Sequence, residues 1–509
     1  NILCLPGHDI RYIRMEKVIL EHLNLVFPKY EVSEANYICV TRNADVSPDD
    51  EALEVTDDFR YLMQQTIHKR RRMAVVRLET ANKLSEETQK YFCGKFEIEP
   101  NQIFRTKMPM KLDYIFGISG NLPEAMKRSL TYTPFSPQNS GHVAAGNVMR
   151  QIKKKDILLF YPYESMDPFL RLIKEASVNP DVMTIKITIY RLAKKARLVE
   201  YLCAAAENGK EVVVLVELRA RFDEESNIEY SRKLEEAGCR VIYGLNGYKV
   251  HSKLCLISRK TDKGVSYITQ IGTGNYNEKT SALYTDLSLI TANQEIGKEA
   301  AEVFAALLKG EVVEKSNLLL VAPKCLQNRV LDMIQEEIDQ VKQGKEGYIG
   351  IKINSLTDKV IINKLVEASQ AGVKIEMVVR GICCLIPEIK GYTENIKVIS
   401  IVGRYLEHSR IYRFGTKERE KIYIASADFM TRNTVRRVEV AAPVLNEKLK
   451  ERLDWMFETM MNDDEKGKRL TETGNYADRS LNDVKLNSQE IFYAMAYSNA
   501  EKTQKKRED

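Results

Sequence analysis

The sequence predicts an α/β protein made of two tandem copies of one unit, preceded by part of an α/β head domain. In each unit we expect a mainly parallel β-sheet flanked by helices. Three observations lead to this prediction. Beyond residue 142, segments rich in β-branched residues alternate with helical patterns, as in parallel βαβ units. The order of segments repeats from about residue 319, and each copy carries one histidine at the same place.

The first copy follows this alternation element by element. A predicted strand, "DVMTIKITIYR" (181–191), precedes the amphipathic helix "LVEYLCAAAENGK" (198–210), which ends near Gly209. The strand "EVVVLVELRARF", the helix "NIEYSRKLEEAG" and the strand "CRVIYG" then carry the chain from 211 to 244. Each helix between two strands is long enough to serve as a parallel crossover.

The second copy matches the first in four segments. These pairs are "VMTIKITIY" with "YIGIKINSL", "LVEYLCAAAENGKEVVVLVEL" with "IINKLVEASQAGVKIEMVVRG", "YKVHSKLCLI" with "YLEHSRIYRF", and "YITQIGTGNYNEKT" with "IYIASADFMTRNT". Chance similarity between generic βαβ halves is the alternative explanation. We favour a duplication, because the matching segments occur in the same order.

The first part of the chain mixes helical and strand patterns. We expect a helix over 11–27, a strand over 73–79 and a helix over 85–96. The stretch "TYTPFSPQNSGH" is rich in turn formers and predicts a domain boundary. The expected domains are a head domain over 1–133, a first catalytic domain over 134–318, and a second over 319–509 with a polar tail.

The composition excludes several protein classes. Charged residues make up 29% and hydrophobic residues 44% of the chain, which is typical of a soluble globular protein. The net charge of +6 permits an anionic partner but does not indicate nucleic acid. The nine cysteines form no CxxC pair, so we expect reduced thiols in a cytosolic protein rather than a zinc site or disulfides. No stretch is long and apolar enough for a membrane span.

The best candidates for chemistry are the two histidines of the repeat. His251 and His408 are each followed two residues later by a cation, Lys253 and Arg410. On a strand, residues two apart share a face, so each histidine is expected to lie beside its cation. If the two copies pack with pseudo-twofold symmetry, all four side chains line one basic cleft that suits phosphate chemistry. A lone histidine on a strand is more often an ordinary core residue, and the duplication argues against that alternative.

Arginines at predicted strand ends point to the same cleft. Arg191, Arg219 and Arg221 end strands in the first copy, and Arg380 ends one in the second. Ligands gather at the carboxyl ends of strands in α/β sheets, and a guanidinium grips phosphate oxygens in a bidentate way. The sequence contains neither GxxxxGK[ST] nor GxGxxG, so any nucleotide is expected to bind without these loops.

Paired H-x-K/R motifs followed by small-residue turns resemble the phospholipase D superfamily. Within it, the strings "IYRLAK", "ELRARFDEE", "VHSKL", "IGTGNYNEKTSALYTD", "VVRGICCLIP", "YLEHSRIYRF" and "SADFMTRN" resemble the long-chain-synthesising bacterial polyphosphate kinases. The resemblance runs from about residue 130 to about residue 490, and it implies two phospholipase D-like catalytic domains. The family's helical N-terminal domain is not found in this sequence, so we expect a fragment.

The resemblance implies a reversible transfer of the γ-phosphate of ATP to a polyphosphate chain. His251 would form a phosphohistidine, and His408 would be the general acid. Tyr284, Arg380 and His408 match positions that contact ATP, and Arg191 and Arg221 match a Mg²⁺ site. A guanidinium has no lone pair for a metal, so we expect these two arginines to hold phosphate oxygens that bind Mg²⁺.

The resemblance also bears on partners and location. It implies ATP, ADP and inorganic polyphosphate as partners, a homo-oligomer (dimer or tetramer), no nucleic acid, and a cytoplasmic protein with possible peripheral attachment to a membrane. Cationic side chains such as Lys253 and Arg410 would stabilise the charge of the phosphoryl group while it is transferred.

Each histidine also needs a carboxylate to orient its other ring nitrogen. Asp286 and Glu439 are the candidates, at comparable distances after the two histidines. The alternative is that both carboxylates pair only with surface arginines.

One departure separates kinase from diesterase chemistry. Phospholipase D enzymes complete H-x-K-x(4)-D with an aspartate, where this chain has Ser258 in the first copy and Gly415 in the second. The sequence therefore favours the kinase. The alternatives are a phospholipase D-like phosphodiesterase and a polyanion-binding fragment without activity.

Overall fold

The computed structural model describes residues 2–7, 10–43, 73–107, 109–141, 143–144, 146–192, 196–217, 224–245, 247–481 and 483–508. Contacts divide the chain into two compact units, Asn1–Phe135 and Ser136–Asp509, and the dividing point falls within the turn-rich stretch at 131–142. The second unit contains both copies of the repeat, here called the first half and the second half. The three domains expected from the sequence stay a prediction.

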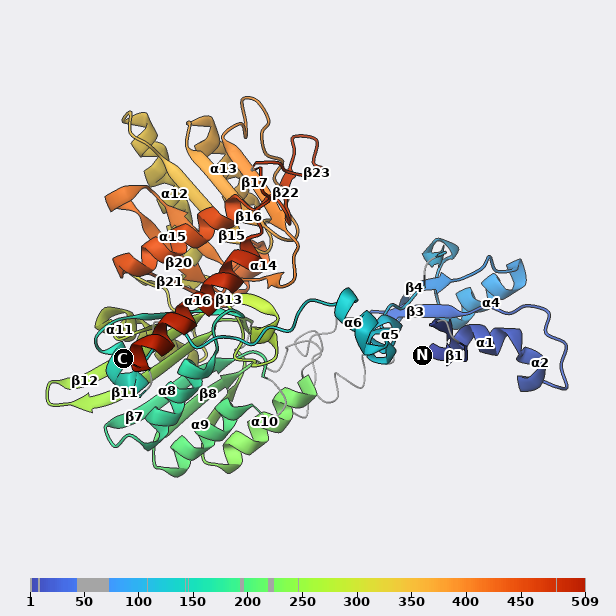
Figure 1. The fold of residues 1–509 in the computed structure, drawn as a ribbon, viewed down its shortest axis with the longest axis horizontal. Coiled ribbons are helices and arrows are strands. Elements are labelled where there is room, and N and C mark those ends of the chain that lie inside the picture. Colours follow the sequence, from blue (N-terminus) through green and yellow to red (C-terminus); the bar gives the residue numbers. More distant parts are fainter. Residues whose placement is uncertain are drawn as a thin grey trace. The chain divides into compact units, whose positions relative to one another are not determined.

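The first unit holds two small sheets and short helices (Figure 1). Strands β1 (Ile2–Leu5) and β2 (Arg11–Arg14) pair antiparallel, so the helix expected over 11–27 is wrong in its first turn. The other elements are α1 (Met15–Glu21), α2 (Leu23–Val26), β3 (Ile38–Arg42), β4 (Val75–Thr80), α4 (Glu86–Phe96), β5 (Ile103–Arg105), α5 (Tyr114–Asn121) and α6 (Glu124–Leu130). Ser85 caps α4 by accepting a hydrogen bond from the Thr88 amide at 3.2 Å.

The first half of the second unit is a sheet with helices packed on it. Its strands are β6 (Ile157–Tyr161), β7 (Val182–Ile189), β8 (Glu211–Val216), β9 (Arg240–Tyr243), β11 (Leu254–Thr261), β12 (Gly264–Gly272) and β13 (Tyr284–Thr291). Its helices are α7 (Val148–Ile152), α8 (Asp167–Val178), α9 (Arg197–Glu207), α10 (Glu224–Glu236) and α11 (Gln294–Leu308).

The second half repeats this plan (Figure 1). Its strands are β14 (Leu320–Ala322), β15 (Tyr348–Ile353), β16 (Lys374–Val379), β17 (Ile396–Ile401), β19 (Ile411–Phe414), β20 (Lys421–Ala425), β21 (Arg437–Pro443), β22 (Gly467–Leu470) and β23 (Tyr476–Ala477). Its helices are α12 (Leu326–Lys342), α13 (Lys359–Gln370), α14 (Thr431–Val435), α15 (Glu447–Met461) and α16 (Ser488–Glu508).

The α/β class with two repeated units is confirmed, but the expectation of mainly parallel sheets is wrong. Strands β7, β8 and β9 are parallel, whereas β11, β12 and β13 pair antiparallel. The cause is the length of each connection. Helices join the parallel strands, while β11 and β12 meet through a tight turn that closes at Gly264, whose φ is +108°.

The two halves exchange short strands. Strand β10 (Lys249–Val250) belongs to the first half of the chain but pairs in parallel with β21 of the second sheet. Strand β18 (Leu406–Glu407) belongs to the second half and pairs in parallel with β13 of the first sheet. Each sheet therefore includes two residues from the other half.

This exchange corrects the expected position of the histidines. His251 and Lys253 do not lie in the middle of a strand, because the link 251–253 carries the chain from β10 in one sheet to β11 in the other. The link 408–410 does the same between β18 and β19. Both histidines thus stand where the chain crosses from one sheet to the other.

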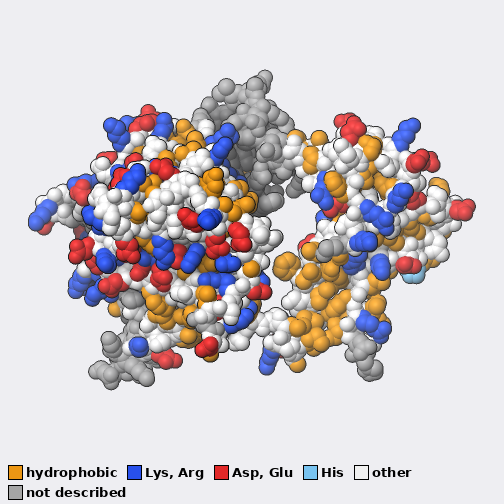
Figure 2. All heavy atoms as spheres, turned by 90° about the horizontal axis from the view of Figure 1, so that it is seen from above, with side chains coloured by type: hydrophobic (Ala, Val, Ile, Leu, Met, Phe, Trp, Pro, Cys, Tyr) orange, Lys and Arg blue, Asp and Glu red, His pale blue; other side chains and the backbone are white. Residues whose placement is uncertain are grey.

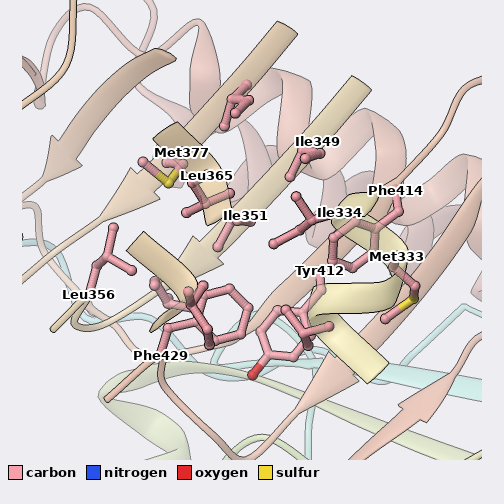
Figure 3. Packing of buried hydrophobic residues seen from close by; sticks show 14 of the residues in the cluster. Met333, Ile334, Ile349, Ile351, Leu356, Leu365, Met377, Tyr412, Phe414 and Phe429 are labelled. Carbon is pink, nitrogen blue, oxygen red and sulfur yellow. The ribbon is translucent and has the colours of Figure 1, made fainter. Parts of the chain in front are cut away.

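A large hydrophobic core lies in the second half (Figure 3). Ile351 on β15 lies inside it, fully shielded from solvent. We expect Ile351→Ala to lower the free energy of unfolding by about 3 kcal/mol, because removing the side chain leaves a cavity. Trp455, the only tryptophan, lies on α15 in the same half and can report urea unfolding by fluorescence. The control, Val360→Ala, alters a side chain on α13 that is 51% exposed, and equal losses in both variants would contradict the prediction.

Candidate active site

His408 is held by a chain of three polar groups from the first sheet. Its Nδ1 lies 2.9 Å from each carboxylate oxygen of Asp286, on β13. The Thr273 hydroxyl donates to the same carboxylate at 2.6 Å and accepts from the Leu287 amide at 2.9 Å. Because Asp286 and Thr273 are both buried, the carboxylate and the ring have little freedom to turn.

The second sheet holds His251 in the same way. The Nδ1 of His251 lies 2.9 Å from one oxygen of Glu439 and 3.0 Å from the other. The Ser426 hydroxyl donates to Glu439 at 2.5 Å and accepts from the Val440 amide at 3.0 Å. In both halves the hydroxyl precedes its carboxylate by 13 residues. The site is thus pseudo-symmetric down to individual hydrogen bonds.

The pairing is crosswise. Asp286 and Glu439, the two carboxylates suggested by the sequence, each contact the imidazole of the opposite half. The exchanged strands explain this, because β10 places His251 beside β21 and β18 places His408 beside β13. Glu439 also has an arginine nearby, with Arg437 Nη1 at 3.9 Å.

Thr273 and Ser426 were missed by the sequence reasoning. A signal was present, since both copies place a hydroxyl at the same point of the segment after the histidine, in "GTGN" and "ASAD". Hydroxyl residues in turns are common, so that signal carried little weight before the contacts were known.

Gly274, in the small-residue turn, leaves the space that Asp286 occupies. A Cβ atom on Gly274 would lie 2.0 Å from Oδ2 of Asp286. We therefore expect Gly274→Ala to displace this carboxylate and to lower turnover by about 10- to 100-fold, as for other losses of a group that orients a catalytic histidine. The control is Gly94→Ala, since a Cβ there meets nothing within 4 Å. Steady-state assays measure both, and unchanged turnover in Gly274→Ala would refute the constraint.

The cation of each motif is buried below the histidine. Lys253 is 1% exposed and donates to the carbonyl of His251, and its burial lowers its pKa to about 7. Arg410 donates through Nε and Nη2 to Asp428, at 3.2 and 3.0 Å. Its Nη1 lies 3.3 Å from Nε2 of His408. A guanidinium can only donate, so Nε2 of His408 is an acceptor here and the ring is neutral.

Aromatic rings border both imidazoles. The Tyr190 ring meets that of His251 edge-on, with centroids 4.8 Å apart, and Tyr284 lies 5.3 Å from His408. Around Tyr190 stand three cations, Lys249, Lys253 and Arg191, each between 5.3 and 5.5 Å from the ring centroid. These rings and cations make an amphipathic, positively charged wall.

Arg380 joins the His408 side through one intermediate. It donates to the Asn354 side chain at 3.1 and 2.9 Å, and Asn354 donates to the His408 carbonyl at 3.2 Å. Tyr284 and Arg380 therefore stand on the side of His408, and Arg191 on the side of His251. Arg219 and Arg221 lie outside the residues that the structure describes.

Burial shapes the protonation of the site. It lowers the pKa of His251 well below 6.5, helped by Lys253, Arg437, Arg410 and His408. Burial also lowers the pKa of His408 and raises that of Glu439 to about 7. The site is thus poised around two neutral imidazoles.

Asp286 behaves differently from Glu439. Its burial alone would raise the pKa, but His408, Thr273 and Arg410 outweigh that effect and lower the pKa. This carboxylate therefore stays ionised beside its histidine, whereas Glu439 can hold a proton near neutral pH.

Known proteins resemble this chain along most of its length. The chain matches the family models polyphosphate kinase middle domain over residues 2–118, C-terminal domain 1 over 147–313, and C-terminal domain 2 over 319–489. It is 40% identical over 494 residues to the polyphosphate kinase of Staphylococcus epidermidis, covering 97% of this chain and 67% of the relative. The Bacillus anthracis polyphosphate kinase is 38% identical over 499 residues, at 97% and 70% coverage.

The chain belongs to the polyphosphate kinase family. A solved structure agrees, because the Porphyromonas gingivalis polyphosphate kinase superposes with a TM-score of 0.83 at 33% identity, covering 98% of this chain and 74% of that one. The resemblance inferred from the sequence is confirmed, and family membership makes the protein a phosphotransferase. The phosphodiesterase alternative is not favoured by these relatives. The chain spans about two thirds of the length of these Staphylococcus and Bacillus kinases.

The residues around the two histidines are better suited to binding phosphate than to binding a bare metal ion. Within the described residues, no cluster of three or more His, Cys, Asp or Glu side chains could hold a metal ion. Lys253, Arg437 and Arg410 lie near His251, and their positive charge repels a bare Mg²⁺ and attracts a polyphosphate.

The surface agrees with the modest net charge. Acidic and basic side chains are interspersed over the face of the second unit in Figure 2, at the left of that view. In the described part of the chain, no helix combines the length and apolar character needed to cross a membrane.

Proposed function

We propose that His251 is the phosphoryl-accepting nucleophile of this kinase. The observation that carries the proposal is the pairing of Nδ1 with Glu439 at 2.9 Å, which places the proton on Nδ1 and leaves the lone pair on Nε2. Burial and nearby cations keep the ring neutral and therefore nucleophilic at neutral pH.

The reaction has two balanced steps. Nε2 of His251 attacks the γ-phosphorus of ATP, the N–P bond forms, the bond to the β,γ-bridging oxygen breaks, and ADP leaves. A terminal oxygen of polyphosphate then attacks the same phosphorus, the N–P bond breaks, and the chain is one phosphate longer. Both steps exchange one phosphate linkage for another, so the transfer is reversible.

His408 serves the leaving oxygen in this proposal. The resting ring is neutral because Arg410 donates to it at 3.3 Å. The negative charge of a bound triphosphate would raise its pKa, so that it can take a proton and pass it to the departing oxygen. Tyr284 and Arg380 stand on the same side, where they can contact the nucleotide.

Charge stabilisation would come from Lys253, Arg410 and Arg191. Arg191 would hold the phosphate oxygens that bind Mg²⁺, and the ion would supply neutralisation of part of the triphosphate charge. ATP, ADP and polyphosphate are thus the proposed partners. A dimer or tetramer and a peripheral membrane association stay predictions from the resemblance.

Brief incubation with γ-labelled ATP and Mg²⁺ tests the proposal. We expect an acid-labile, alkali-stable label on the wild-type protein that is absent from His251→Ala. The control is His22→Ala, at an exposed histidine of the first unit. Cleavage of a model diester without any label would support the phosphodiesterase instead. Retention on a polyphosphate column without either activity would leave only a binding protein.

A further inference from the structure

Helix α16 joins the two halves of the second unit. Figure 1 shows it crossing from the second half onto the first. The ring of Phe492 packs against Phe160 and Tyr163 of the first half, with centroid distances of 5.3 and 5.6 Å. It also packs against Trp455 on α15 of the second half, at 5.5 Å. The helix is therefore anchored to both halves at once.

The first turn of α16 places the buried side-chain amide of Gln489 against the residues that precede His408. Gln489 is 2% exposed. Its Oε1 accepts from the Tyr405 amide at 2.9 Å, and its Nε2 donates to the Tyr405 carbonyl at 2.9 Å. The same Nε2 donates to Glu407 at 2.7 Å. All three contacts fix residues 405–407, which lead directly into His408.

Gly403 leaves the space for this amide. A Cβ atom at Gly403 would lie 2.5 Å from Oε1 of Gln489 and 2.9 Å from its Cδ. Any side chain at this position would therefore push the amide away from Tyr405. The close approach of Gly403 to Gln489 is a second, independent observation that fixes the position of the Gln489 side chain.

From Glu407 the contacts continue to His408. The other oxygen of Glu407 accepts from Lys352 Nζ at 2.9 Å and from the Thr285 hydroxyl at 2.9 Å. That hydroxyl in turn accepts from the His408 amide at 3.1 Å. The residue after Thr285 is Asp286, which holds the imidazole. Glu407, Thr285 and Lys352 are all buried, so movement of one shifts the others.

We propose that Gln489 is a positioning residue for His408. It acts through Glu407 and Thr285, and it makes the departure of ADP in the first step depend on the docking of α16. The inference rests on the proposed function for the part that His408 plays in turnover. The contacts that place His408 do not rest on it.

The first half is built differently at this point. Val250 stands where the second half has Glu407, and its amide donates to Glu217 of the first half at 2.8 Å. A change at Gln489 should therefore disturb His408 and leave His251 in place.

Histidine NMR on the whole chain tests this, because it contains only six histidines. In Gln489→Leu we expect the ring signals and titration of His408 to shift, while those of His251 stay as in the wild type. Turnover should fall about tenfold, as for the loss of a hydrogen bond to a buried charge, with the KM for ATP changed less than about twofold. γ-Labelled ATP should still label His251, about tenfold more slowly, because His408 serves the departing ADP.

Two further variants distinguish positioning from simple loss of stability. Gln489→Glu sets two carboxylates against each other, so its defect should be largest at high pH and shrink as protonation of either one restores a donor. The exchange Glu407→Gln with Gln489→Glu restores one amide and one carboxylate, and should recover much of the activity. Glu490→Gln, at the next and exposed residue, is the control.

The proposal is overturned if the His408 signals do not move in Gln489→Leu and Gly403→Ala. It is also overturned if His251 moves as much as His408, or if the exchanged pair is no better than Gln489→Glu alone. A failed phosphohistidine mechanism gives a different result. His251→Ala would then keep its label, while the His408 shift in Gln489→Leu would still report the contact.

Discussion

Glu439→Gln is expected to slow the labelling of His251 by about 10³- to 10⁴-fold while leaving the fold intact. The amide is nearly the same size as the carboxylate, and Ser426 can still donate to its oxygen. Its NH₂ group, however, can donate to Nδ1 of His251. The proton of the ring would then reside on Nε2, and the nucleophilic lone pair would be lost. Rapid-quench measurement of phosphoenzyme formation gives the rate.

Two related variants set the scale for Glu439→Gln. Ser426→Ala removes only the hydroxyl that donates at 2.5 Å, so a smaller loss of about 10- to 100-fold is expected. Asp286→Asn makes the equivalent change beside His408. Because His408 serves the departing oxygen of ADP, this variant should also slow the labelling of His251, but it leaves the proton of His251 on Nδ1. Wild-type labelling by Glu439→Gln would show that this carboxylate does not set the tautomer.

Lys253→Met is expected to lower kcat/KM by about 10²- to 10³-fold, because it removes a buried positive charge next to the nucleophile. The charge is also sensitive to pH. The pKa of Lys253 is about 7, so the ammonium loses its proton as the pH rises through that value, and the rate should fall on the alkaline side. The pKa of Glu439 is also about 7, and its ionised form is the one required, so the rate should fall on the acid side. A bell-shaped profile centred near neutral pH follows.

Lys253→Arg separates the two limbs of this profile. A guanidinium stays charged throughout the range, so the alkaline limb should disappear while the acid limb remains. Arg410 stands at the equivalent place in the second half and is 3% exposed, so a buried arginine fits this position of the repeated unit. The profile of kcat/KM is measured from about pH 5.5 to about pH 9. Superimposable profiles for wild type and Lys253→Arg would assign the alkaline limb to another group.

The repeat made much of the site predictable. Matching the two copies placed His251 with His408 and Lys253 with Arg410, and a search for orienting groups selected Asp286 and Glu439. These residues are recognisable because histidine is rare in the chain and because a buried imidazole needs a partner. Family resemblance then supplied the chemistry, which geometry alone would leave open.

The crosswise pairing could not be predicted in the same way. It depends on strands of two residues, β10 and β18, which are too short to show any periodicity. Gln489 was equally hidden, since it lies 82 residues beyond its partner Glu407 and glutamine at a helix start is unremarkable. The mixed sheets were missed because a short turn, rather than strand composition, decides whether two strands run antiparallel.

Because of the exchanged strands, neither half can complete its site without the other. A polypeptide containing only one copy would bury a carboxylate with no imidazole beside it. Its own histidine would lack the carboxylate that orients it. It could complete the constellation only by associating with a second molecule of itself. Joining the copies in tandem turns that association into an intramolecular one, and each copy is then free to diverge. The two copies have diverged at equivalent places, with Lys253 in one and Arg410 in the other, and with Asp286 in one and Glu439 in the other.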